Sequence, residues 1–220
     1  MKSLLIFPAQ WYPTQPYLST PYLCAYLKEK NWDVSQRDFN IESYENFLSP
    51  ALLEKAVSKM SDRLNVLKEK KSFSFKEKSL TDVLTTGIKF APTIISGVDD
   101  AKDIMRTPER FFNFNNYKQA DMIIRSALKL VSDAYSPSIL TLSTFESGTR
   151  AEESTQRAAE VTHNQDVNPF IDLYEEVLLP SEPWKEYNLV GISIVGISQI
   201  LPGLTLARLL KEKYPHLHIT

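Results

Sequence analysis

The chain has 220 residues, of which 43% are hydrophobic and 24% are charged, as in an ordinary globular protein that is long enough to bury a core. Its 25 Lys and Arg residues nearly balance 27 Asp and Glu residues, and the formal charge of -2 removes the electrostatic case for a nucleic-acid partner or an anionic membrane surface. The single cysteine, Cys24, excludes an internal disulfide and a cysteine-built metal site.

The first residues, MKSLLIFPAQ, change to Pro and Gln after a short apolar stretch, and they predict no signal peptide. A membrane-spanning helix needs a run of about 18 or more apolar residues, and the sequence contains none. We therefore expect a cytoplasmic protein.

The N-terminal residues predict a strand, a helix and a second strand. Ser3 to Phe7 is an apolar run that Pro8 closes, because proline cannot continue a central strand. After a Pro-rich loop, Thr20 and Pro21 favour a helix start, with Thr as the cap. Asn31 suits the left-handed position that ends a helix, and residues 32–39 then predict a strand.

A long segment, residues 41–185, has mostly helical periodicity. Such a length without strands is typical of a helical insertion or subdomain, not of a loop. Ser49 and Pro50 predict the start of one helix, and residues 80–105 predict two more, interrupted around Pro92 and Gly97. Further predicted elements are a short helix from Thr107-Pro108, an amphipathic helix at 117–134 with Ile123, Ala127, Leu130, Val131 and Ala134 on one stripe, a strand at 139–142 and a helix at 167–178.

The C-terminal residues repeat the plan of the N-terminal ones. Residues 189–195 (LVGISIV) form the continuous apolar run of a parallel strand covered on both faces. A loop at 196–201, a helix opened by Pro202 and a strand at 216–220 follow. Two right-handed crossovers of this kind predict an open, doubly wound parallel α/β sheet.

This pattern predicts three segments: a first βαβ part at 1–40, a mostly helical insertion at 41–185 and a second βαβ part at 186–220. Because the last residues have strand character, we expect the sheet to continue beyond Thr220 in a longer parent protein. The alternative is a small four-stranded sheet that ends on an edge strand.

Two loops follow strands whose carboxyl ends meet at one edge, the usual ligand position in such sheets. The first holds Gln10, Trp11, Tyr12, Pro13 and Thr14, so it is stiff and aromatic and suits one side of a flat ligand. The alternative is that Trp11 and Tyr12 only cover the sheet end. In the second loop, Gly196 permits close approach of a ligand, and Ser198 and Gln199 offer neutral hydrogen-bonding groups.

Several functions of such sheets are not supported by the residues. The first loop lacks the glycines of a dinucleotide-binding Rossmann turn, and no Walker loop is present. The strand ends at Phe7 and Val195 lack the acidic residues of a phospho-acceptor domain. His163, His216 and His218 suggest no Ser-His-Asp arrangement, and we expect Cys24 to be a buried small hydrophobe.

Two blocks of sequence, FPAQWYPTQPYLSTPYLCAYLKEKNWDV and NLVGISIVGISQILPGLTLARLLKEKYPHLHI, carry a family resemblance. Together with PERFFNFNNYKQA, LKLVSDAYSPSILTLSTFES and the NPF of residues 168–170, they resemble the N-terminal cobalamin-binding domain of cobalamin-dependent radical S-adenosylmethionine (SAM) enzymes. The resemblance covers nearly the whole chain, and the VGIS…SQ…P..TLARLLK block is its most specific part.

The resemblance implies that the corrin ring of cobalamin lies over the carboxyl ends of the strands. Residues expected to face it are Gln10, Trp11, Tyr12, Pro13, Thr14, Ser193, Val195, Gly196, Ser198 and Gln199. It further implies a partner barrel on the same polypeptide, which carries the iron-sulfur cluster and SAM, and a parent enzyme that is a methyltransferase. A peptide or a small molecule is the expected substrate, and the domain by itself is expected to be inert.

One departure concerns cobalt. Many cobalamin modules use an Asp-x-His-x-x-Gly motif whose His binds the metal, and that motif is missing, since His163 does not fit it. The sequence therefore predicts cobalamin without a protein histidine on cobalt.

Two other functions stay open. One is a module that docks a substrate or partner and no longer binds cobalamin. An independent enzyme is less favoured, because few ionisable groups fall in the two loops.

Overall fold

The computed structural model describes residues 2–149 and 154–220, and its internal contacts divide the chain into two units. The sheet unit comprises Met1–Tyr44 and Leu142–Thr220, and the helical unit comprises Glu45–Thr141. The predicted insertion, 41–185, extends further along the chain than the helical unit, because residues 142–185 have most of their contacts with the sheet unit.

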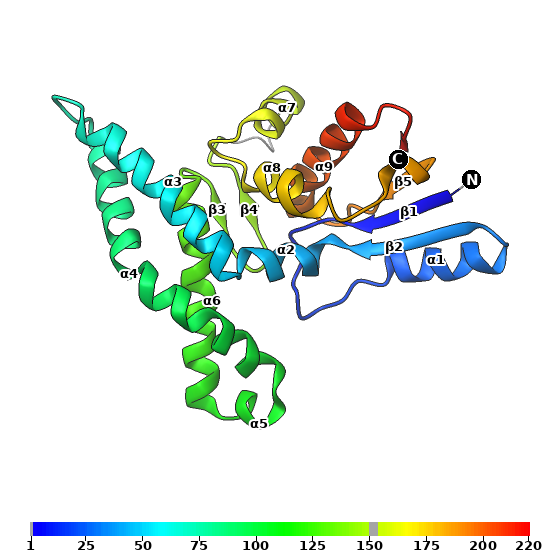
Figure 1. Cartoon of the computed structure of the whole chain (residues 1–220), viewed down its shortest axis with the longest axis horizontal. Helices are drawn as coiled ribbons and strands as arrows, with labels where there is room; N and C mark the ends of the chain where they lie inside the picture. The colour runs from blue at the N-terminus through cyan, green and yellow to red at the C-terminus, as the bar shows by residue number, and fades with distance from the viewer. Residues whose placement is uncertain (1, 150–153) are drawn as a thin grey trace. The chain divides into compact units, whose positions relative to one another are not determined.

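The sheet is parallel, as predicted. It contains β1 (Lys2–Phe7), β2 (Asp33–Asp38), β5 (Leu189–Ile192) and β6 (His218–Ile219), in the order β2-β1-β5-β6 (Figure 1). The predicted strand at 189–195 ends early, since the backbone leaves the ladder after Ile192. The class of the protein is therefore α/β with a four-stranded parallel sheet.

Helices cover both faces of this sheet. Helix α1 (Ser19–Glu29) packs Cys24 and Leu27 against Leu5 and Val34 on one face. Helix α9 (Ile200–Lys213) lies on the other face, because a Cβ on Gly203 would meet the side chains of Ile192 and Ile194. Side chains alternate along a strand, so Leu5 and its neighbour Ile6 point to opposite faces.

Two predicted helix starts were wrong in detail. Helix α1 begins at Ser19 and has no side-chain cap, because Thr20 is buried instead of capping. Helix α9 begins at Ile200 after a short 3-10 turn, η4 (Ile197–Gln199), so Pro202 lies inside its first turn. The predicted helix end is confirmed: Asn31 has a positive φ of 60°.

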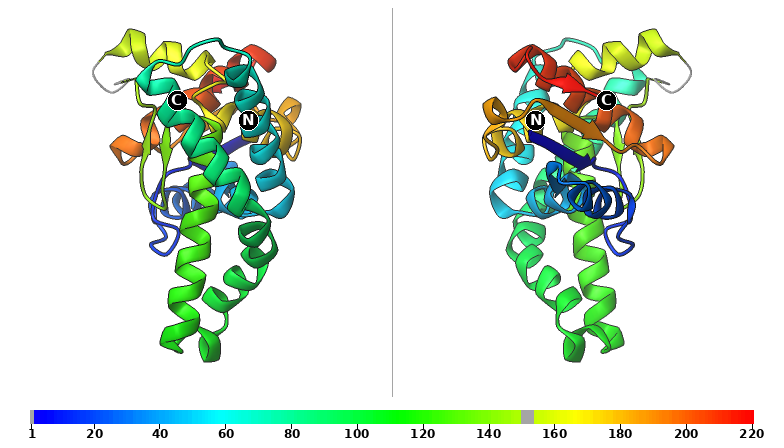
Figure 2. Two further views of the ribbon diagram at one scale, coloured as in Figure 1. Left: turned by 90° about the vertical axis from the view of Figure 1, so that its left-hand side faces the viewer. Right: turned by 90° about the vertical axis from the view of Figure 1, so that its right-hand side faces the viewer.

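The helical unit is built on three long helices. They are α3 (Pro50–Lys68), α4 (Phe75–Arg106) and α6 (Phe114–Ala134), with the short α5 (Pro108–Phe111) between the last two and the strand β3 (Ile139–Leu140) after them. Helices α4 and α6 pack side by side along much of their length (Figure 2). The predicted cap is confirmed, since Ser49 Oγ accepts a hydrogen bond from the Leu52 amide at 3.3 Å.

The prediction of two helices within 80–105 was wrong, because α4 continues through Pro92 and Gly97. A capping box of Ser74 and Glu77 starts this helix. Its buried face extends across the expected break, and the packing of that face offsets the local cost of the proline. The buried residues are Leu84, Ala91, Ile94, Val98, Ala101 and Ile104.

Several further elements lie within the described residues, and some of them build an aromatic core of the sheet unit. They are α2 (Phe39–Phe47), β4 (Phe145–Glu146), α7 (Thr155–His163), α8 (Pro169–Leu173), the π-helical turn η2 (Tyr174–Leu178) and the 3-10 turn η3 (Trp184–Glu186). The predicted helix at 167–178 thus begins at Pro169 and widens at Tyr174. Phe39, Phe170, Tyr174 and Trp184 are almost fully buried and pack ring against ring.

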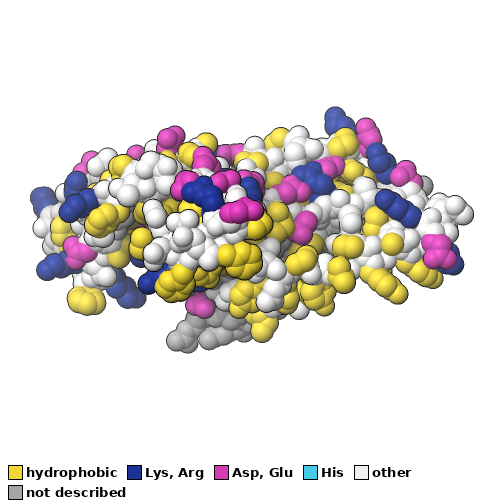
Figure 3. Space-filling view, turned by 90° about the horizontal axis from the view of Figure 1, so that it is seen from below, with side chains coloured by type: hydrophobic (Ala, Val, Ile, Leu, Met, Phe, Trp, Pro, Cys, Tyr) yellow, Lys and Arg dark blue, Asp and Glu magenta, His cyan; other side chains and the backbone are white. Residues whose placement is uncertain are grey.

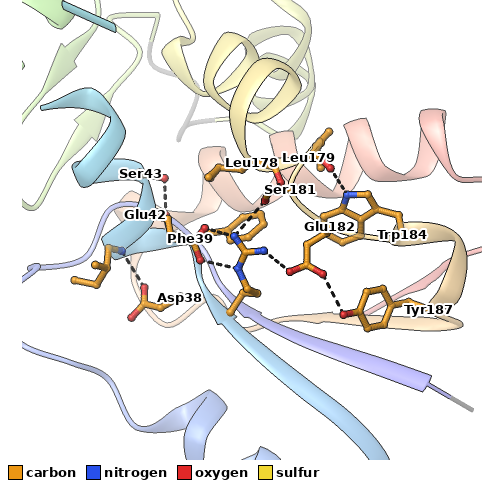
Figure 4. Close-up of polar contacts among 12 residues, drawn as sticks. Asp38, Phe39, Glu42, Ser43, Leu178, Leu179, Ser181, Glu182, Trp184 and Tyr187 are labelled. Atoms are coloured by element: carbon orange, nitrogen blue, oxygen red, sulfur yellow. Dashed lines mark hydrogen bonds and ion pairs between the residues drawn. The ribbon is translucent and has the colours of Figure 1, made fainter. Parts of the chain in front are cut away.

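An arginine near the end of β2 ties this strand to the segment before β5. The Arg37 guanidinium is ion-paired with both Glu42 and Glu182 and donates to Ser181 Oγ at 3.2 Å. Tyr187 donates to the same Glu182 at 3.1 Å, so this carboxylate lies between the two donors (Figure 4). The side chain of Glu182 is only 11% exposed, and it therefore depends on Arg37 for its charge balance.

We expect Arg37→Ala to lower the free energy of unfolding by about 2 kcal/mol, because it leaves Glu182 largely buried without its cation. Urea denaturation would measure the change. Arg125→Ala removes an exposed pair with Asp121 on α6 and serves as the control, with an expected cost below about 0.5 kcal/mol. Equal costs for the two variants would contradict this role.

Within residues 2–149 and 154–220, no helix is both long enough and apolar enough to cross a bilayer.

Candidate functional site

The candidate site lies where β1 and β5 meet. β1 connects through α1 to β2 on one side, and β5 connects through α9 to β6 on the other, so the direction in which successive strands are added to the sheet reverses between these two parallel strands. The two strands pair up to Ile6 and Ile192, and the Ser193 amide donates to the Ile6 carbonyl at 2.9 Å. Both following loops therefore leave from the same point of the carboxyl edge, where open α/β sheets bind ligands.

Gln10, in the first loop, combines backbone strain with a buried amide. Its φ of 79° lies in the left-handed region, which costs a non-glycine residue about 1 kcal/mol or more. The residue is 1% exposed, and neither amide atom of the side chain completes a hydrogen bond with the described residues. Its amide lies within weak hydrogen-bonding reach of the Tyr44 hydroxyl, in a contact that falls short of good geometry: burial raises the pKa of Tyr44, and the contact with Gln10 opposes the rise. A strained residue with an unsatisfied polar group is typical of a functional site.

Trp11 is fixed by two hydrogen bonds. Its amide donates to Asn40 Oδ1 at 2.8 Å, and its indole Nε1 donates to the Gln15 carbonyl at 2.9 Å. Asn40 is itself buried at the start of α2. Because both the backbone amide and the indole of Trp11 are hydrogen-bonded, the ring is held in one orientation near the end of β1.

The aromatic side chains of this loop form one cluster. Tyr17 stacks on Phe7, with ring centroids 5.7 Å apart, and Trp11 meets both rings edge to face. Tyr12 packs on the outer side of Trp11 and is exposed. Pro13 is half-buried and Thr14 is exposed, so Thr14 reaches the surface of the loop.

Gln199, in the second loop, links the two loops. It is fully buried; its Nε2 donates to the Pro8 carbonyl at 2.8 Å, and its Oε1 accepts from the Val195 amide at 3.0 Å. Both ends of its carboxamide are therefore used inside the protein. Gln199 positions the loops, and its side chain would contact a ligand only after losing these bonds.

Gly196 packs against the indole of Trp11, since a Cβ at this glycine would lie 3.3 Å from the ring. The contact brings the two predicted loops together. Ser193 Oγ lies 2.8 Å from Ser19 Oγ at the start of α1, and Ser198 is half-buried. The predicted residues of both loops thus gather at one edge of the sheet.

The side chains that the two loops expose are apolar or uncharged. Ile197 is 79% exposed, and several other large side chains of the two loops also contact solvent: Tyr12, Tyr17, Leu18, Ile194 and Val195. Hydrophobic side chains, drawn in yellow, are exposed at many places on the face of the molecule shown in Figure 3. We call this surface, formed by Tyr12, Tyr17, Leu18, Ile194, Val195 and Ile197, the edge platform. Exposed apolar surfaces of this kind are typical of binding sites.

The loops contain no carboxylate, imidazole or ammonium group. The nearest strand end carries Asp38, whose pKa is raised by burial while hydrogen bonds from the backbone amides of Ile41 and Asn40 oppose the rise. These bonds place Asp38 at the start of α2 as a cap. Among the described residues, no group of three or more His, Cys, Asp or Glu could hold a metal ion.

The other residues considered from the sequence lie elsewhere. Cys24 lies on the buried, sheet-facing side of α1, as predicted. His163 ends α7, and His218 pairs with Leu189 at the amino end of β5, opposite the edge platform. Asn168 is buried and caps α8, where it also donates to Thr205 Oγ1 at 2.9 Å.

Sequence reasoning missed the residues that hold the site in place. Asn40 fixes Trp11, and Ser19 contacts Ser193. The position of Asn40, two residues after the end of β2, offered a signal, because β2 is the neighbour of β1 in a doubly wound sheet. Nothing in the sequence indicated the left-handed backbone of Gln10.

The chain was compared with known proteins, and no family model, curated protein or solved structure matches it.

We expect Gln199→Leu to lower the free energy of unfolding by about 2 kcal/mol, because it leaves the Pro8 carbonyl and the Val195 amide without their partner. The exposed Gln36→Leu on β2 is the control and is expected to change stability by less than about 0.5 kcal/mol. Thermal and urea unfolding would measure both. A neutral effect of Gln199→Leu would show that the link between the loops is dispensable.

Proposed function

We propose that the edge platform binds a flat, largely neutral cofactor, and that this cofactor is cobalamin. The observation that carries the proposal is an uncharged aromatic and aliphatic surface at the switch point between β1 and β5. In this reading the chain is the Rossmann-like cobalamin-binding domain of a radical SAM enzyme, most simply a methyltransferase. The sequence resemblance motivates the choice of cofactor.

The chemistry of the residues suits a corrin ring. The face of the ring is apolar, and Tyr12, Ile194 and Ile197 offer it exposed apolar contacts. Amide side chains surround the ring, and the unsatisfied Gln10 carboxamide and the Ser198 hydroxyl are neutral groups of the kind that bind amides. Gln10 is buried, so this contact requires the first loop to open.

The loops supply no imidazole for the lower face of cobalt. The domain would therefore hold the cofactor by ring contacts and not through a histidine ligand. Bound cobalamin would supply a methyl carrier, and the iron-sulfur cluster and SAM would belong to the partner barrel. The task of this chain is then to bind and orient the ring and to keep water from one face.

A second function, docking of a substrate or partner without cobalamin, is favoured by one observation. Leu18, the N-cap residue of α1, and Tyr22 and Tyr26 within this helix are spaced four residues apart and are largely exposed. Residues with this spacing share one face of a helix, and an exposed aromatic stripe is typical of a protein-binding surface.

Incubation with hydroxocobalamin followed by gel filtration tests the first proposal. We expect corrin absorbance to elute with the protein. Ile197→Asp places a charge on the edge platform and is expected to weaken binding about tenfold or more, whereas Val66→Asp, at another exposed hydrophobic position on α3, should not. The proposal fails if the protein retains no corrin, or if both variants retain it equally.

Electron paramagnetic resonance of bound cob(II)alamin tests the cobalt environment. We expect no nitrogen superhyperfine splitting from a protein imidazole, because the two loops contain no histidine. The matched control is the His163→Ala variant, whose spectrum should be unchanged. A nitrogen splitting that disappears in that variant would contradict the proposed binding mode.

A further inference from the structure

A separate cavity of about 430 Å³ opens between α4 and α6 of the helical unit. Its volume lies in the range of small-molecule sites. The walls are mainly apolar, with a few polar groups from both helices. The lining residues include Val83, Gly87, Phe90 and Ile94 of α4 and Ser126, Lys129, Leu130 and Asp133 of α6.

Three charged side chains line this cavity, Asp82, Lys129 and Asp133, and of these only Asp133 is buried. Its side chain is 11% exposed, and both of its oxygens accept from Lys129 Nζ at 2.7 Å. The side chain of Lys129 is 65% exposed, so the cation of the pair is largely in water while the carboxylate is not. Burial raises the Asp133 pKa, and Lys129 opposes the rise.

A second pair on the same helix shows what is unusual about Asp133. Asp121 and Arg125 have the same spacing of four residues on α6, with a distance of 2.8 Å. The side chain of Asp121 is 28% exposed, compared with 11% for Asp133, and Asp121 does not line the cavity. The Asp121–Arg125 pair is an ordinary surface ion pair. The Asp133 carboxylate, by contrast, is largely buried and lines a cavity that a ligand can enter.

Gly87 keeps the carboxylate accessible from α4. A Cβ at this position would lie 3.4 Å from Asp133 Oδ2 and 2.4 Å from Met60 Cε. The glycine therefore leaves no side chain between the α4 backbone and the carboxylate, while Met60 of α3 closes the space behind it. A glycine inside a helix costs about 1 kcal/mol relative to alanine, and close packing with Met60 accounts for its presence here.

We propose that this cavity binds a small organic ammonium compound with a compact apolar body. Its ammonium group takes the place of Lys129 on Asp133. Its apolar part contacts Val83, Ile94 and Leu130, and the Phe90 ring lies at the rim. A buried carboxylate favours a cation that loses little solvation, and an exposed lysine is readily displaced. The site lies in the helical unit and does not depend on cobalamin binding.

Titration of the whole chain with benzylammonium, benzyl alcohol and benzoate, followed by amide NMR shifts, tests the proposal. We expect benzylammonium to bind at least about tenfold more tightly than the other two, with shifts at residues of α4 and α6 that line the cavity. Equal binding of all three compounds, or no saturation by benzylammonium at about 10 mM, would overturn it.

Asp133→Asn keeps the shape of the side chain and should abolish the preference for the cation, while Asp121→Asn should leave it unchanged. Ser126→Leu, which fills the cavity from α6, provides a second variant if Asp133→Asn does not fold. It should weaken benzylammonium binding at least about tenfold. Binding that neither change affects would rule out this cavity. A failure here would leave corrin binding untouched, so the two proposals can be separated.

Discussion

The parallel pairing of β1 with β5 is the constraint on which the candidate site depends. These strands come from opposite ends of the chain, and their hydrogen bonds set the starting points of both loops. Gln199 then extends the contact beyond the strands, because its amide joins Pro8 of one loop to Val195 of the other. The Trp11 ring can pack against Gly196 only within this frame. The edge platform is the outer surface of the same arrangement.

Much of the sheet could be predicted from the sequence because its signals are local. Continuous apolar runs indicated β1 and β5, and Asn31 indicated the end of α1. The expected break in α4 was wrong because Pro92 and Gly97 are local signals, whereas the buried stripe from Leu84 to Ile104 depends on tertiary packing. Local signals and tertiary packing also compete at the end of β5. The apolar run predicted a strand up to Val195, but Ile194 and Val195 lie beyond the ladder and are exposed in the loop.

The site was only partly predictable for a related reason. Residue type indicated that Trp11, Gly196 and Gln199 belong to loops at the carboxyl edge. It could not indicate their individual roles: Gln199 links the loops, Gly196 accommodates an indole ring, and Gln10 is strained and buried. These roles arise from contacts between segments that are far apart in the sequence. Gln199 and Gly196 hold the two loops in position, so the exposed apolar side chains are the groups that a ligand meets first.

Hydrogen exchange of the whole chain, with and without hydroxocobalamin, tests the central claim most directly, because it reports the location of binding. The account predicts slower exchange of backbone amides in residues 9–18 and 193–199, the two loops that form the edge platform, and little change in α3 and α4. Unchanged exchange in both loops at a saturating concentration, or protection confined to the helical unit, would contradict it.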